Sequence, residues 1–328
     1  MFRLPASFSQ ERPGGALHRK CGHEAVRNRV AATDLSARVA KFENTIGGPM
    51  DHEDVLRQAA AKYGLTSLAP IAQGGQKLVA RAVQGSADVV VKVVLIAGAP
   101  DPHALERCER EVALLKSLSH PNVVRVLSEL EVLGSPAEAT YWVEEYLEGD
   151  DLTALVGPQW AWDDAEKMMY EVASGLAAMH QLNCVHRDLS ARNVRRTSSD
   201  QWKILDPGLA KHLDRSSITG LFTPGTPGFM SPEQATAGVR VTPASDVYSL
   251  GILAFLALTG DVPIPVGASF ADYRTRLLYT DPPSLGAVRG DLDANQAALV
   301  DGCIARQPGR RWIDADELLS ELVDLREN

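Results

Sequence analysis

The stretch Val185-His186-Arg187-Asp188-Leu189-Ser190-Ala191-Arg192-Asn193 brings together one imidazole, two guanidiniums, one carboxylate and one carboxamide. It follows residues 162–182, where apolar residues recur at helical spacing. Ionisable groups placed so densely beside an apolar segment are costly to position unless chemistry uses them. Taken alone, the stretch is also compatible with a charged surface loop after a helix, so the neighbouring segments decide its meaning.

Two further segments belong with this stretch. The run Val89-Val90-Val91-Lys92 places a lysine among apolar residues, and Asp206-Pro207-Gly208 follows a short apolar run. The series resembles the β3 lysine, the catalytic loop and the metal-binding turn of a bacterial, eukaryotic-like serine/threonine protein kinase. This resemblance spans about residues 66–320. It implies an α+β, bilobal protein kinase fold, in which a small β-rich N-lobe carries helix C and the larger C-lobe is helical.

The resemblance implies an ATP site in the first half of the chain. Lys92 would hold the α- and β-phosphates and pair with Glu111, which lies in the helical pattern of residues 105–118. Lys77 stands where kinases usually carry a glycine of the phosphate-covering loop, so it either hinders close backbone approach or supplies charge to the phosphates. Glu145 and Leu147 would meet the adenine edge, and Asp151 the ribose. The other residues implied to line the site are Ile71, Ala72, Gly74, Gly75, Val79 and Val90.

The catalytic loop and metal-binding turn would supply the chemistry of phosphoryl transfer. Asp188 would orient the acceptor hydroxyl and take its proton, while Arg192 would add positive charge. Asn193 and Asp206 would hold Mg²⁺, or alternatively Mn²⁺, because hard cations prefer oxygen ligands. The implied cofactors are therefore ATP and a divalent metal.

The segment after the metal-binding turn is polar and resembles an activation loop. Thr219 and Thr223 are its first candidate phosphorylation sites, followed by Ser216 and Ser217. Arg187 would bind the phosphorylated loop through a charge-assisted pair. Residues 225–235 then resemble the peptide-docking segment of Ser/Thr kinases, with Thr226 in it. Glu233 of that segment is expected to pair with Arg311.

Besides Lys77, four positions depart from the family pattern. Ser190, with Arg192 two residues later, follows tyrosine-kinase spacing, although the docking segment favours Ser/Thr acceptors. Pro207 replaces the usual phenylalanine, Arg195 stands at the floor of the adenine pocket, and Glu144 occupies the gatekeeper position, where it would contact Lys92 or bind water. The prediction is an ATP-dependent Ser/Thr protein kinase that phosphorylates its own activation loop. The alternatives are a pseudokinase acting as a nucleotide-binding or scaffold module, and a tyrosine or dual-specificity kinase.

Composition narrows the remaining classes of protein. The 328 residues carry a net charge of −9, which offers no general positive field for nucleic acid or anionic lipid. The four cysteines lie far apart, as expected in a reducing compartment, and no apolar run is long enough for a membrane span. We therefore expect a soluble, cytoplasmic protein that acts on protein substrates and is compatible with homodimers for trans-autophosphorylation.

The chain divides into four expected parts. Residues 1–49 lack a sustained period and are expected to be disordered, and Met50 is the hypothesised native start. Residues 50–65 form a short flanking helix, capped by Asp51 and ended by Gly64. Residues 66–147 make the kinase N-lobe and residues 148–322 the C-lobe.

Overall fold

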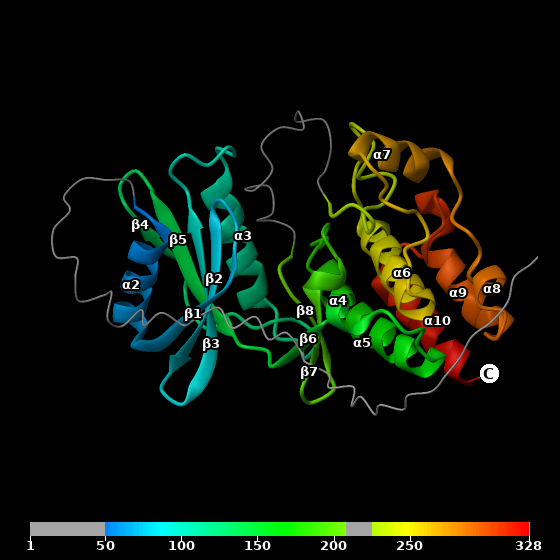
Figure 1. The fold of residues 1–328 in the computed structure, drawn as a ribbon, viewed down its shortest axis with the longest axis horizontal. Helices are drawn as coiled ribbons and strands as arrows, with labels where there is room; N and C mark the ends of the chain where they lie inside the picture. The colour runs from blue at the N-terminus through cyan, green and yellow to red at the C-terminus, as the bar shows by residue number, and fades with distance from the viewer. Residues whose placement is uncertain (1–49, 208–224, 328) are drawn as a thin grey trace, which may run out of the picture. The chain divides into compact units, whose positions relative to one another are not determined.

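The computed structural model describes residues 50–207 and 225–327. The predicted phosphorylation sites Thr219, Thr223, Ser216 and Ser217 lie outside these ranges. The first half of the fold contains α2 (His52–Tyr63), β1 (Leu65–Gln73), β2 (Lys77–Gln84), β3 (Ala87–Leu95), α3 (Ala104–Ser117), β4 (Glu131–Leu133) and β5 (Ala139–Glu145) (Figure 1). Its strands form an antiparallel sheet in the order β1-β2-β3-β5-β4.

Most of β3 is buried on both faces, which explains its uninterrupted valine run. Successive side chains of a strand point to opposite faces. Val91 and Val93 join the apolar cluster that contains α2, while Val94 joins the cluster that contains α3. Lys92 therefore lies on the same face as Val94 and points toward α3. The sheet is covered by α2 on one face and by α3 on the other (Figure 1).

Helix α2 is an integral layer of the small lobe. Its N-cap, Asp51, accepts a 2.8 Å hydrogen bond from the Asp54 amide, and Gly64 ends it with φ 63°. Both ends follow the predicted caps, since a left-handed C-cap favours glycine. Val55, Leu56 and Ala59 are buried against the sheet.

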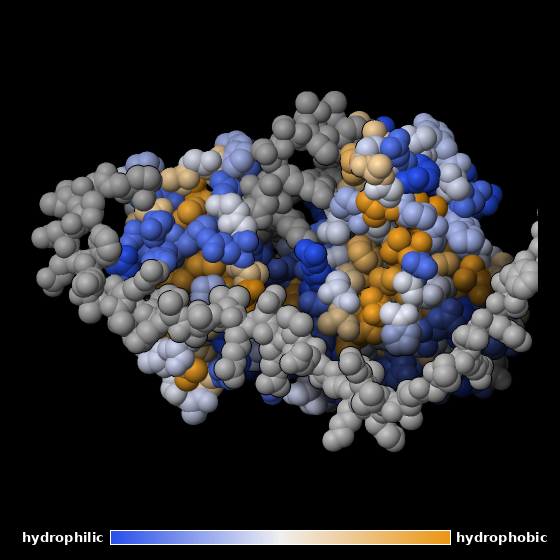
Figure 2. Space-filling model, viewed as in Figure 1, coloured by the Kyte–Doolittle hydropathy of each residue, from blue (hydrophilic) through white to orange (hydrophobic). Residues whose placement is uncertain are grey.

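The second half of the fold is largely helical. Its elements are β6 (Gly149–Asp151), α4 (Leu152–Leu155), α5 (Trp162–Gln181), η1 (Ala191–Asn193), β7 (Val194–Thr197), β8 (Trp202–Ile204), α6 (Pro243–Thr259), α7 (Phe270–Tyr279), α8 (Leu285–Val288), α9 (Ala294–Cys303), η3 (Pro308–Arg310) and α10 (Ala315–Glu327). Strands β6, β7 and β8 form a small antiparallel sheet in that order. In the view of Figure 2, hydrophobic residues reach the surface around α4, α5 and α6.

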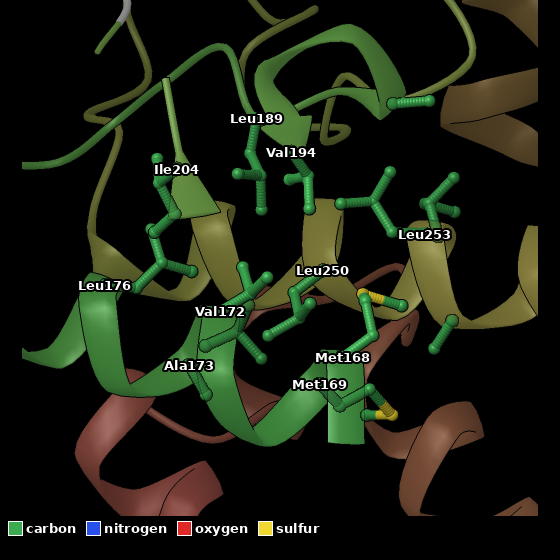
Figure 3. Packing of buried hydrophobic residues seen from close by; sticks show 14 of the residues in the cluster. Met168, Met169, Val172, Ala173, Leu176, Leu189, Val194, Ile204, Leu250 and Leu253 are labelled. Carbon is green, nitrogen blue, oxygen red and sulfur yellow. The ribbon is translucent and has the colours of Figure 1, made fainter. Parts of the chain in front are cut away.

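The core of this half lies directly beneath residues 185–193. Val172 and Leu176 of α5 point toward Ile204 of β8 and Leu250 of α6 (Figure 3). Leu189 enters the same cluster from above and is buried. Packing of this side chain is therefore one of the contacts that hold the loop that carries Asp188. None of the helices in the described parts of the chain combines the length and apolarity needed to cross a membrane.

Candidate active site

The backbone of the catalytic loop is held by a buried carboxylate on α6. Asp246 accepts hydrogen bonds from the amides of His186, at 2.7 Å, and Arg187, at 2.9 Å. Arg187 adopts φ 64°, a strained conformation for a residue with a side chain. Asp246 is 1% exposed and also lies 3.0 Å from a ring nitrogen of His180. Sequence reasoning did not assign Asp246 a role, although an acid in a mostly apolar helix was a signal for one.

His186 ties the loop to the end of β8. Its Nε2 lies 3.0 Å from the carbonyl oxygen of Leu205, and its Nδ1 lies 3.3 Å from the amide of Asp188. The residue is fully buried. Both contacts are to backbone groups, so His186 shapes the loop rather than facing a substrate.

Asp188 is joined to two of the predicted site residues. Thr226 donates a 2.7 Å hydrogen bond to its Oδ1, and the Asn193 amide nitrogen donates to its backbone oxygen at 2.9 Å and to Oδ2 at 3.3 Å. Because these hydrogen bonds use the side-chain nitrogen of Asn193, its carboxamide oxygen is the atom that could bind a metal ion. Asp188 Oδ1 accordingly accepts a hydroxyl group, which is the contact that a base for phosphoryl transfer must make.

The docking segment is anchored through Glu233 and Gln234. Arg311 donates to both Glu233 oxygens, at 2.8 and 3.0 Å, which is the ion pair expected from the sequence. Burial alone would raise the pKa of Glu233, but the hydrogen bonds from Arg311 and Ser245 lower it below its ordinary value. Gln234 donates to the carbonyl oxygen of Arg187 and thereby joins this segment to the catalytic loop.

Lys92 is surrounded by three carboxylates, and both acids expected beside it lie within ion-pair distance. Its ammonium lies 2.7 Å from Glu144 and contacts Asp206, but it is 3.8 Å from Glu111. Both Glu111 oxygens lack a hydrogen-bond partner among the described residues. Burial lowers the pKa of Lys92, yet the carboxylates of Asp206, Glu144 and Glu111 outweigh burial and raise it above the ordinary value. The main partner on the small-lobe side is thus the gatekeeper Glu144, and the expected pairing to Glu111 is secondary.

Lys77 binds the other oxygen of the same aspartate. Its ammonium lies 2.9 Å from Asp206 Oδ2, while Lys92 contacts Oδ1. Burial alone would raise the pKa of Asp206, but these two lysines hold it well below its ordinary value. Asp206 has φ 47°, and Pro207 behind it is buried.

Three more predicted residues lie at the end of β5 and in or beside the small sheet. The carboxylate of Glu145 accepts hydrogen bonds from Lys203, at 2.6 Å, and from the Arg125 amide, at 3.0 Å. Asp151 caps α4 by accepting a 3.0 Å hydrogen bond from the Thr153 amide. Arg195, at the expected floor of the adenine pocket, donates to the carbonyl oxygen of Gly149.

Two residues of the catalytic loop differ in exposure. Arg192 is exposed to solvent, whereas Ser190 is 1% exposed. The hydroxyl of Ser190 has no partner among the described residues. The guanidinium of Arg192 is therefore accessible from solvent.

The oxygen donors present fit a metal held together with a polyphosphate. In the described parts of the chain, no group of three or more His, Cys, Asp or Glu side chains forms a complete metal cage. Mg²⁺ is usually bound by one or two protein oxygens, several waters and substrate phosphates. The Asp206 carboxylate and the Asn193 carboxamide supply ligands of this kind.

A family model described as the protein kinase domain matches residues 66–321. The chain belongs to the protein kinase family. This kinase is 31% identical over 290 residues to serine/threonine-protein kinase pkn3 of Myxococcus xanthus, covering 84% of the chain and 52% of that protein. It is 32% identical over 249 residues to PknB of Mycobacterium leprae, covering 74% and 40%.

Solved structures agree with the fold. The kinase domain of Mycobacterium tuberculosis PknI shares 21% identity and a TM-score of 0.59, covering 80% of this chain and 96% of that one. The predicted bilobal fold is therefore correct. The kinase chain spans about half the length, or less, of the first curated relatives it matches.

Proposed function

We propose that the chain is an active, ATP-dependent Ser/Thr protein kinase. The observation that carries this proposal is the direct hydrogen bonding of Asp188 to Asn193 and to the hydroxyl of Thr226, on a loop fixed by Asp246. Asp188 takes the proton of the acceptor hydroxyl, and Asn193 and Asp206 would hold Mg²⁺. The metal, when bound, neutralises charge on the phosphates. Residues 66–147 and 148–322 act as the two lobes, with residues 50–65 packed on the first.

The acceptor is a serine or threonine hydroxyl of a protein. Relatives of this chain carry the name serine/threonine-protein kinase. The contact of Thr226 with Asp188 supports the same class, because it places the docking segment against the base. Arg192 compensates for the lysine that Ser190 replaces. Autophosphorylation in trans, through a transient homodimer, is part of this proposal.

The test compares the wild-type protein with Asp188→Asn in the presence of Mg-ATP. Sites of phosphorylation are mapped by mass spectrometry, and ATP binding is measured separately by calorimetry. We expect wild type to label its own Thr219 or Thr223 and the variant to bind ATP without labelling. Equal labelling of both proteins, or none in a wild type that binds ATP, would contradict catalysis. Phosphotyrosine as the main product would reverse the assignment of the acceptor.

A pseudokinase is the second candidate. It is favoured by one observation, namely that both oxygens of Asp206 are bound by lysines. A chain that never loads a metal would gain stability from this arrangement. A pseudokinase of this kind would bind nucleotide equally tightly with EDTA and with Mg²⁺, and it would show no turnover in either condition.

A further inference from the structure

Lys77 occupies a position from which it can serve two partners. It lies at the start of β2, paired with Val94 of β3, and two residues before Val79, which is paired with Lys92. Directly paired residues of an antiparallel sheet share a face, as do residues two apart on one strand. Lys77, Val79 and Lys92 therefore project from the same face, the one that meets Asp206.

The two lysines that hold Asp206 are not equivalent. Lys92 is 5% exposed and keeps Glu144 at 2.7 Å and Glu111 at 3.8 Å as additional partners. Lys77 is 20% exposed, and Asp206 is the one carboxylate recorded within ion-pair distance of it in the described residues. If one ammonium must leave Asp206, Lys77 is the one that gives up fewer ion pairs. Its greater exposure to solvent also makes its side chain easier to move.

Binding of a metal–nucleotide complex would require one of the two ammonium groups to leave Asp206. A divalent ion bound through Asp206 needs at least one of the two oxygens that the ammonium groups now occupy, and it repels both cations. A released Lys77 would find the phosphates on its own face of the sheet. A lysine is suited to this change, because its ammonium is a compact charge on a flexible stem with no fixed bonding geometry.

We propose that Lys77 is a second phosphate-binding lysine, which neutralises Asp206 in the free protein and transfers to the nucleotide phosphates when the metal nucleotide binds. The inference rests on the proposed ATP site and adds a residue to it. It also resolves the two interpretations that the sequence left open, in favour of charge supplied to the phosphates.

The experiment measures binding rather than turnover. Adenosine, ADP and ATP are titrated by calorimetry, with Mg²⁺ and with EDTA, into wild type, Lys77→Met and Lys77→Arg. The control is Lys62→Met, since Lys62 also pairs with one carboxylate, Glu131, but lies on the α2 side of the sheet. Circular dichroism verifies that each variant is folded.

We expect Lys77→Met to weaken Mg-ATP binding about tenfold or more, as the loss of a charge-assisted contact implies. Adenosine affinity should change by less than about twofold, because adenosine carries no phosphate for the lysine to bind. Lys77→Arg should retain most of the affinity for Mg-ATP, and Lys62→Met should match wild type.

Two results would overturn the inference. If Lys77→Met binds Mg-ATP as tightly as wild type, or more tightly, then Lys77 acts only as a counter-ion that blocks Asp206. If the variant loses adenosine affinity equally, the lysine supports the pocket rather than the phosphates. A wild type that binds no nucleotide would instead overturn the ATP site itself, and this inference with it.

Discussion

The anchoring of Lys92 by Glu144 can be tested with two isosteric substitutions, Glu144→Gln and Glu111→Gln. Each removes a charge while preserving shape. Glu144→Gln should destabilise the protein more than Glu111→Gln. The opposite order would be expected if Glu111 of α3 were the main partner of Lys92. The Trp142 contact survives the Glu144→Gln substitution, because an amide oxygen also accepts the 2.7 Å indole hydrogen bond that Glu144 accepts.

The magnitude follows from the two distances. At an effective dielectric constant of about 20, opposite charges 2.7 Å apart attract by about 6 kcal/mol and those 3.8 Å apart by about 4 kcal/mol. Only Glu144 is in direct contact with the ammonium, while Glu111 lies about one ångström farther away. After the cost of desolvation, a direct contact of this kind between charged groups contributes about 1.5–3 kcal/mol net. Glu111 receives no hydrogen bond among the described residues, so neutralising it also removes the cost of burying its charge.

We therefore expect Glu144→Gln to cost about 2–3 kcal/mol and Glu111→Gln less than about 1 kcal/mol. For a protein of this size the first loss corresponds to a fall in Tm of about 3–6 °C. Urea unfolding without nucleotide measures both, because a bound ligand would add its own stabilisation. The control is Glu53→Gln, which makes the same substitution at a solvent-exposed position of α2. A Glu111→Gln variant as unstable as Glu144→Gln would refute this account of Lys92.

Three further predictions concern the framework around the site. Arg311→Met should destabilise the protein by about 3–5 kcal/mol at neutral pH, because it leaves Glu233 buried without its partner. Since the pKa of Glu233 is lowered in the folded state, wild type should lose the contribution of this pair as pH falls below the ordinary carboxyl pKa, and acid titration of the unfolding free energy should show a smaller loss in the variant. Asp246→Asn should lower kcat with little change in ATP affinity, measured by steady-state kinetics and calorimetry, because Asp246 holds the catalytic loop and not the nucleotide. Leu56→Ala should cost about 2–5 kcal/mol in chemical unfolding, as expected for a fully packed side chain between α2 and the sheet.

Local patterns predicted much of the fold. The caps of α2 were recognisable from Asp51 and Gly64, whose roles depend on side-chain chemistry and backbone conformation alone. The order of motifs predicted the bilobal architecture and the pair of Glu233 with Arg311. These features depend on short stretches or on a family pattern, so one sequence sufficed to find them.

Contacts between distant segments were less predictable. Lys77 and Asp206 are 129 positions apart, and nothing in the glycine-bearing turn indicates which way the lysine points. The choice of Lys92 between Glu144 and Glu111 depends on a difference of about one ångström between side chains on separate elements. The role of Asp246 in the catalytic loop was not predicted, because the loop groups that it binds are backbone amides, which have no sequence signature.

The choice of Glu144 changes how the lysine can be regulated. Lys92 lies opposite Trp142, and Val90 lies opposite Glu144, so the lysine and its carboxylate belong to two directly paired strands. Strand pairing holds them together whatever the position of α3. In kinases controlled through helix C, movement of that helix breaks the lysine's ion pair. Here such a movement would remove only the longer contact to Glu111, and Lys92 would stay in place. Under the proposed function, control of the site would then fall to Asp206, because at least one of its two oxygens would have to exchange a lysine for the metal.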